Sequence, residues 1–169
     1  MSAAAVDLER VRAAVAAVPD PELPVVGLGD LGILRDVHEE DGRVVVTVTP
    51  TYSGCPATEV IEQSVLDAIE AAGLGPVQVR LQRAPAWTTD WISEDGRRKL
   101  REYGIAPPGH LAPDGAQPLR FVGRRRDPVA CPRCASTQTE QLSAFGSTAC
   151  KSLYRCLACR EPFEYFKPI

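Results

Sequence analysis

Four cysteines near the end of the chain form two C-x-x-C pairs, and this spacing constrains the fold more than any other feature. The pairs are Cys131-Pro-Arg-Cys134 and Cys156-Leu-Ala-Cys159. Two residues between thiolates let one tight turn point both sulfurs at a single ion, and two such turns complete a tetrahedral shell. We therefore predict a zinc ribbon with four cysteine ligands and with strands at 137–142, 151–155 and 163–167.

The ribbon segment, residues 130–169, is too short for a stable apolar core, so the metal is expected to supply most of its folding free energy. Iron bound as in rubredoxin uses the same ligands, and two disulfides are a further alternative. No secretory signal is visible, and the reducing cytoplasm favours metal over disulfides. Because four protein ligands close the shell, a structural metal is favoured over a catalytic one.

One further thiol, Cys150, precedes the second pair in Ser147-Thr-Ala-Cys-Lys-Ser. Such a spare thiol is either a buried core residue or an auxiliary, transient metal ligand. Sequence alone leaves both interpretations open.

The cysteines are distributed unevenly, since five of the six lie after residue 130. This imbalance predicts two domains: 1–105, then a linker at 106–129 rich in Pro, Gly and Arg, then the ribbon at 130–169. The net charge of −3 gives no overall attraction to nucleic acid or anionic membranes. No apolar run approaches the roughly 18–20 residues that span a bilayer. We expect a cytoplasmic protein.

The first domain shows alternating helix and strand patterns. Apolar spacing, prolines and glycines place the expected elements as follows: a helix at 7–18, strands at 33–37 and 44–49 joined by a turn at 40–42, a helix at 56–72, a strand at 77–82, and a helix at 93–104. The order helix, strand, strand, helix, strand predicts an α+β fold, a small αββαβ sandwich with the helices on one sheet face.

A lone cysteine, Cys55, lies at the predicted junction of the second strand and the second helix. The unpaired N–H groups and positive dipole end of that helix would stabilise its thiolate, which is a soft metal ligand or a nucleophile. The histidines, His38 and His110, are not placed as a base, so Cys–His catalysis is disfavoured. The acidic loop residues Asp20 and Glu22 are metal ligands, proton acceptors, or turn and cap residues; a small buried residue remains the alternative for Cys55.

Three segments carry a family resemblance: Asp20-Pro-Glu-Leu-Pro-Val-Val, Asp30-Leu-Gly-Ile-Leu-Arg-Asp-Val and Thr49-Pro-Thr-Tyr-Ser-Gly-Cys-Pro. Together they resemble the iron–sulfur assembly family that includes SufT and the eukaryotic cytosolic targeting factors. Adding Ala86-Trp-Thr-Thr-Asp-Trp-Ile, Phe145-Gly-Ser-Thr-Ala-Cys-Lys-Ser-Leu-Tyr-Arg-Cys and Glu161-Pro-Phe, the chain resembles the PaaD (PaaJ) branch of the phenylacetyl-CoA epoxidase system. The match covers nearly the whole sequence.

This resemblance implies a maturation factor without catalytic activity of its own. The family's motif positions fall on Asp20, Glu22, Thr51 and Cys55, which implies transient binding of iron or an iron–sulfur cluster there. The implied partners are the epoxidase reductase, which carries flavin and a [2Fe–2S] cluster, the di-iron oxygenase subunits, and the iron–sulfur assembly machinery.

Two other functions compete with this one. In the first, the chain is an interaction module that docks epoxidase subunits through the ribbon and the aromatic segment Trp87–Trp91. In the second, Arg124-Arg-Arg126 and the ribbon bind nucleic acid. The acidic chain disfavours the latter, because a short arginine run in a linker is usually just solvated.

Overall fold

The computed structural model describes residues 7–52, 57–111 and 128–169, and it divides the chain into two compact units, Met1–Gly96 and Arg97–Ile169. Each unit has a sheet of its own. Most of the predicted linker, 106–129, lies outside the described residues, so the predicted domain boundaries stay a prediction. None of the helices in these described ranges is long and apolar enough to cross a membrane.

The first unit has the predicted order of elements: α1 (Leu8–Ala16), β1 (Leu34–Glu40), β2 (Arg43–Val48), α2 (Thr58–Ala71) and β3 (Val77–Leu81). The predicted hairpin is confirmed, with a turn in which Asp41 and Gly42 both have positive φ. Strand β2 lies between β1, which is antiparallel to it, and β3, which is parallel to it. Helix α2 supplies the connection that a parallel pair needs.

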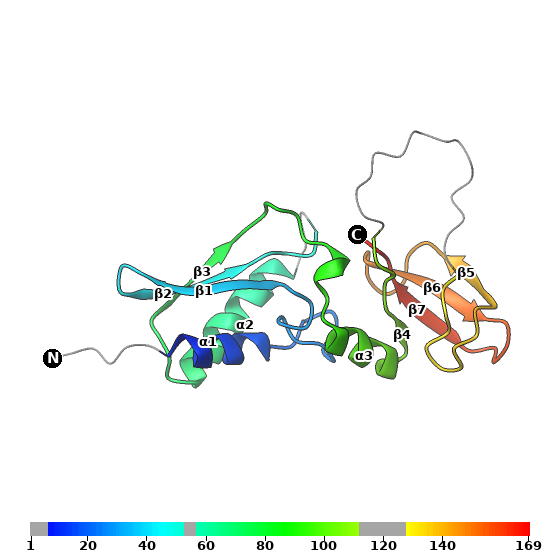
Figure 1. Cartoon of the computed structure of the whole chain (residues 1–169), viewed down its shortest axis with the longest axis horizontal. Coiled ribbons are helices and arrows are strands. Elements are labelled where there is room, and N and C mark those ends of the chain that lie inside the picture. Colours follow the sequence, from blue (N-terminus) through cyan, green and yellow to red (C-terminus); the bar gives the residue numbers. More distant parts are fainter. Residues whose placement is uncertain (1–6, 53–56, 112–127) are drawn as a thin grey trace. The chain divides into compact units, whose positions relative to one another are not determined.

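The helices α1 and α2 lie together on one face of this sheet (Figure 1). Both bury residues at helical spacing, as the apolar pattern predicted: Val11 and Val15 on α1, and Ile61, Val65 and Ile69 on α2. The central strand β2 is buried in every residue after its first. The flanking strands are joined by the ion pair of Glu40 on β1 and Arg80 on β3, at 2.5 Å.

The chain after β3 folds back on the first unit. Trp87 is buried and donates its indole N–H to the carbonyl of Leu31 at 2.8 Å, so this residue serves the core rather than the surface. A short 3₁₀ helix, η1 (Thr89–Trp91), was not expected from the sequence. In it, Trp91 stacks under the guanidinium of Arg35, 3.6 Å from the ring centroid.

The predicted helix near residue 93 is α3 (Glu94–Tyr103), and the unit boundary falls inside it. The Ser93 hydroxyl accepts a hydrogen bond from the N–H of Gly96 at 2.9 Å. Gly104 ends the helix with φ of 96°. Both predicted helix ends are therefore confirmed: Ser93 caps the first turn, and Gly104 ends the last.

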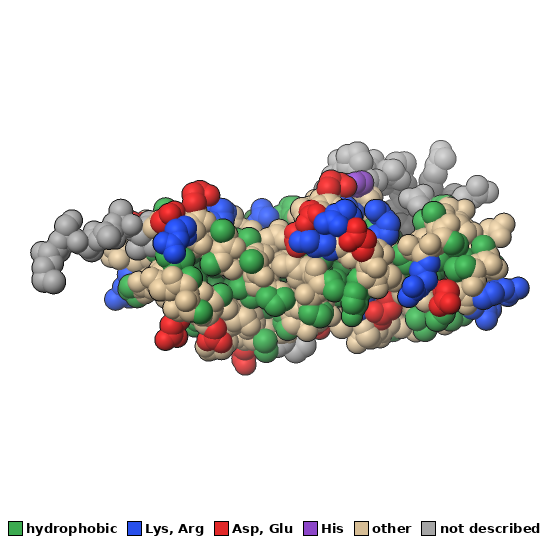
Figure 2. Space-filling view, turned by 90° about the horizontal axis from the view of Figure 1, so that it is seen from below, with side chains coloured by type: hydrophobic (Ala, Val, Ile, Leu, Met, Phe, Trp, Pro, Cys, Tyr) green, Lys and Arg blue, Asp and Glu red, His purple; other side chains and the backbone are tan. Residues whose placement is uncertain are grey.

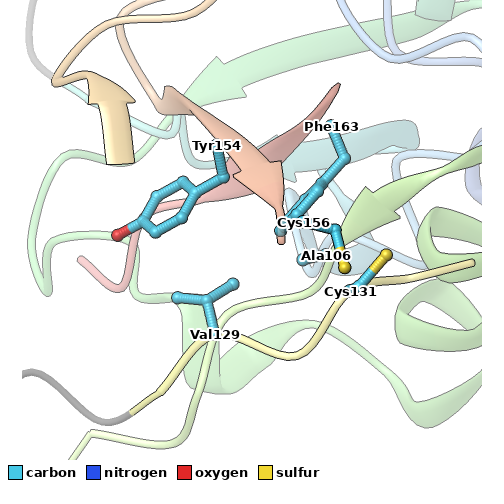
Figure 3. Close-up of a cluster of buried hydrophobic side chains, with 6 residues drawn as sticks. All are labelled: Ala106, Val129, Cys131, Tyr154, Cys156 and Phe163. Atoms are coloured by element: carbon cyan, nitrogen blue, oxygen red, sulfur yellow. The ribbon is translucent and has the colours of Figure 1, made fainter. Parts of the chain in front are cut away.

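The second unit contains a four-stranded sheet in the order β4-β7-β6-β5. Its strands are β4 (Ile105–Ala106), β5 (Thr139–Ser143), β6 (Lys151–Cys156) and β7 (Pro162–Phe166). The last three were predicted to within a few residues. Strand β4 was not, because its two residues carry no periodic pattern; it pairs with β7 in parallel. A small buried cluster fills this unit (Figure 3): Ala106, Val129, Cys131, Tyr154, Cys156 and Phe163.

Candidate metal centre and the Cys55 region

The two cysteine turns of the second unit are built alike. In each, the N–H of the first cysteine bonds to a carbonyl five residues later, Cys131 to Ser136 at 2.9 Å and Cys156 to Glu161 at 3.0 Å. The residue after the second cysteine has positive φ in both, 60° at Ala135 and 68° at Arg160. These matched turns reverse the chain so that both sulfurs of a pair point the same way.

The four sulfurs converge. All four ligand atoms of Cys131, Cys134, Cys156 and Cys159 lie within 4.8 Å of one another. The Sγ atoms of Cys131 and Cys159 are 3.8 Å apart, and those of Cys134 and Cys156 are 3.6 Å apart. A tetrahedron with metal–sulfur bonds of about 2.3 Å has edges of about 3.8 Å. The donor set therefore fits a tetrahedral thiolate-bound metal.

The same distances speak against the disulfide alternative. A disulfide needs sulfurs about 2.05 Å apart, and the five described cysteines are all free. Cys131 and Cys156 are buried, and Figure 3 shows their sulfur atoms pointing toward one another. Cys134 and Cys159 are exposed. One half of the shell thus faces the protein and the other half faces solvent.

The thiols at this site differ in acidity. The backbone N–H of Cys159 approaches the Cys156 sulfur, and this hydrogen bond outweighs desolvation and lowers the pKa of Cys156 to about 6. At Cys159 a backbone hydrogen bond at Glu161 acts to lower the pKa, but desolvation and the neighbouring thiols raise it to about 12. Four thiolates cannot coexist here without a cation, so metal binding must release protons.

The spare thiol Cys150 is not part of this cluster. It is buried, and its Sγ lies 3.0 Å from the Thr148 hydroxyl oxygen. In the described part of the chain, the group of potential metal ligands consists of the four cysteines of the two C-x-x-C turns alone. An auxiliary role for Cys150 stays a prediction.

The residues proposed to act with Cys55 come from two segments at one end of the first sheet. Strand β1 is antiparallel to β2, so the loop that leads into β1 and the segment that leaves β2 lie at the same end. The N–H of Thr49 bonds to the carbonyl of Ile33 at 2.9 Å, and the N–H of Ile33 bonds to Leu28 at 3.0 Å. These backbone hydrogen bonds join the end of the loop before β1 to the segment that leaves β2.

Asp20 is a buried turn residue in that loop. Its Oδ1 accepts hydrogen bonds from the N–H groups of Glu22, at 2.9 Å, and Leu23, at 2.8 Å. This is the turn and cap geometry weighed from the sequence, and it fixes the course of the acidic loop. Glu22 and Thr51 are both half-buried. Cys55 lies outside the described residues, so its part in this site stays a prediction.

Two features of the described residues bear on the Cys55 region. Helix α2 begins after Ala57, which gives no side-chain hydrogen bond to the first turn. Thr49 is buried, and its hydroxyl oxygen has no hydrogen-bond partner among the described residues. Sequence patterns did not identify Thr49 as a candidate site residue. The one sequence feature that marks it is its position directly before Pro50, where the strand ends. His38 is half-buried on β1, with Nδ1 2.8 Å from the Asp36 carboxylate.

Family models match both halves of the chain. Residues 8–81 match a model described as iron–sulfur cluster assembly protein, and residues 115–167 match one described as PaaD zinc beta ribbon domain. A solved domain of unknown function (DUF59) from Bacillus anthracis resembles the structure with a TM-score of 0.50 and 28% identity, over 55% of this chain and 90% of that one. The predicted α+β fold and the ribbon are confirmed.

Two curated proteins are similar in sequence. The putative D component of the 1,2-phenylacetyl-CoA epoxidase of Escherichia coli (strain K12) is 48% identical over 96% of this chain and 93% of its own length. An "Fe-S protein maturation auxiliary factor" of Porphyromonas gingivalis is 38% identical over 49% of this chain and 80% of its own length. The first of these relatives spans both units, so the two units occur together in one protein there.

Proposed function

This chain belongs to the family of the D component of 1,2-phenylacetyl-CoA epoxidase, and we propose that it is an accessory factor of that system, not a catalyst. In this proposal it binds iron or an iron–sulfur cluster transiently through Cys55 and delivers it to the oxygenase or reductase components. The observation that carries the proposal is the joining of an iron–sulfur assembly domain and a PaaD ribbon in one chain. The receiving proteins and the assembly machinery are its partners.

The start of α2 supports a metal-binding thiolate at Cys55. Ala57, at the N-terminal end of α2, gives no side-chain cap, and the first turn carries the positive end of the helix dipole. Both features stabilise a nearby anion, and Cys55 precedes Thr58 by only a few residues. A thiolate kept deprotonated in this way is a soft ligand for iron.

Asp20, Glu22 and Thr51 complete the proposed site. Asp20 orders the acidic loop by accepting two backbone N–H groups, and in this proposal the loop lies beside Thr51. A site with one thiolate and several oxygen ligands holds iron less tightly than a closed set of four thiolates. The reason is that thiolates are the softer donors and bind iron more strongly than carboxylate or hydroxyl oxygens. Weak coordination is what a carrier needs, since an encaged ion could not be handed on.

The four ribbon cysteines would hold zinc in this proposal. A closed shell of four thiolates leaves no open position for a substrate, so the metal serves folding. Both this shell and a free Cys55 thiol need reducing conditions, and the proposal places the protein in the cytoplasm.

Metal and sulfide analysis of anaerobically purified protein tests the proposal. We expect Cys55→Ala to retain zinc and lose iron, while the matched control Cys150→Ala, which changes another lone thiol, retains both. In cells that depend on the variant, the epoxidase reductase should be short of its cluster. Normal cluster loading with Cys55→Ala would contradict the delivery role.

A further inference from the structure

A trough in the second unit lies beside the first cysteine turn. It has a volume of about 560 Å³, which is within the size range of ligand sites. Its floor is apolar, formed by the buried residues Ala106, Pro108 and Val129 together with part of Tyr165. Figure 3 shows Ala106 and Val129 among the side chains of the buried cluster. Its rim includes two exposed arginines, Arg101 and Arg133.

These two arginines are not neutralised by the described residues. Two other arginines of this unit have carboxylate partners: Arg98 pairs with Glu102 at 2.7 Å, and Arg155 pairs with Glu140. Neither Arg101 nor Arg133 has such a pair, and no described Asp or Glu lines the trough. On the face that Figure 2 presents, basic and acidic side chains lie next to one another. The described lining of the trough has the two arginines and no acidic residue.

The fold holds Arg133 in place. It lies inside the Cys131–Cys134 turn, which is closed by a hydrogen bond from the N–H of Ala135 to the carbonyl of Cys131 at 2.9 Å. Its guanidinium rests on the end of α3, with one nitrogen 3.6 Å from where a side chain on Gly104 would begin. The exposed carbonyls at a helix C-terminus attract a cation. Arg101, in the last turn of α3, lines the same trough. A guanidinium fork held in this way is preorganised for a carboxylate.

We propose that this trough binds an acidic segment of a partner protein, with carboxylates at Arg101 and Arg133 and an apolar side chain on the floor. A protein segment is favoured over a small metabolite, because much of the lining, including Gly109 and Ala130, is exposed. Small-molecule sites instead enclose most of their ligand. The proposal rests on the proposed function only in taking the occupant to be a partner protein.

The test is a binding titration with the full, zinc-loaded chain. The probes are fluorescein-labelled octapeptides in which two Glu residues flank Leu, Phe or Trp, and matched peptides with Gln in place of Glu. We expect saturable binding, seen by fluorescence anisotropy, for at least one Glu peptide and not for its Gln counterpart. Arg133→Gln and Arg101→Gln should each lower the affinity for the Glu peptide about tenfold, which is the usual contribution of a charge-assisted hydrogen bond.

Arg160→Gln is the matched control. Arg160 directly follows the second cysteine turn, whereas Arg133 lies inside the first. Like Arg133 it is exposed, but it does not line the trough. Its replacement removes the same charge and should leave binding within about twofold, a difference well under 1.4 kcal/mol. Zinc content and circular dichroism of all variants verify that the fold is intact.

Three results would overturn the proposal. They are no saturable binding of any Glu peptide, equal weakening by Arg160→Gln, or competition by free phenylacetate as strong as that by the unlabelled peptide. The last would assign the trough to a small organic acid. None of these readouts involves Cys55 or cluster loading, so failure here and failure of the delivery function are separable.

Discussion

The two units of this chain bury apolar side chains to very different extents. Of the twelve largest fully buried side chains, only Leu100 and Phe166 belong to the second unit, and the others belong to the first. The buried cluster of the ribbon has six members, and two of these are the cysteines Cys131 and Cys156. The first unit thus has a conventional core, whereas part of the ribbon's interior is its metal site. The comparison predicts that the units depend on metal differently.

Removal of the metal should have the largest effect and should separate the units. Structural zinc in small modules is worth roughly 10–16 kcal/mol, more than the ribbon's small core can replace. With a strong chelator, amide hydrogen exchange should become fast in β5, β6 and β7 and stay slow in β1, β2 and β3. Restoring zinc should reverse it. Slow exchange in the ribbon strands after complete metal removal would contradict the comparison.

Truncation of one core side chain should affect only the first unit. Ile69 on α2 is fully buried, and Ile69→Ala should lower the free energy of unfolding by about 2–5 kcal/mol, because it removes apolar contacts and leaves a cavity. Denaturant unfolding of zinc-loaded protein measures this. The control Val60→Ala, on the same helix but 50% exposed, should change it by less than about 0.5 kcal/mol. A loss of zinc from Ile69→Ala would show that the units are not independent.

A smaller effect is expected at an ion pair inside the ribbon sheet. The Lys151 ammonium, whose side chain is only 4% exposed, lies 2.8 Å from the Glu164 carboxylate. The other Glu164 oxygen accepts the N–H of Ser147 at 2.6 Å. Glu164→Gln should cost about 2 kcal/mol, since it leaves a buried ammonium without its counter-charge. The surface pair is the control: Glu102→Gln, which frees Arg98, should cost less than about 1 kcal/mol.

The pH dependence of the ribbon follows from the same pair. Desolvation acts to raise the pKa of Glu164, but the hydrogen bonds of Lys151 and Ser147, together with the charge of Lys151, outweigh it and hold the pKa below its usual value. The stabilisation is therefore complete above the unfolded-state pKa of about 4.3 and is lost as pH falls through the lowered folded-state pKa. Acid titration of the wild type and Glu164→Gln, compared at equal zinc content measured at each pH, should show their stabilities converging as pH falls.

The sequence predicted the local elements well where a pattern repeats or a residue type restricts the backbone. The apolar spacing of α2, the turn at Asp41-Gly42 and the Ser93 cap are visible in the sequence because each depends on neighbouring residues. The two-residue strand β4 and the 3₁₀ helix η1 were missed, because neither is long enough to show a period. No sequence pattern indicated the hydrogen bond from the Trp87 indole to the carbonyl of Leu31, because the two residues are far apart along the chain.

The candidate sites divide in the same way. C-x-x-C spacing is local chemistry, so the sequence identified all four cysteines that converge. It also determined the order of elements and the family resemblance. Only the tertiary structure decided that β2 is central and parallel to β3, that Lys151 faces Glu164, and that Arg133 meets the end of α3 over an apolar trough. These contacts join residues far apart along the chain, and no local periodicity or spacing encodes which of them meet.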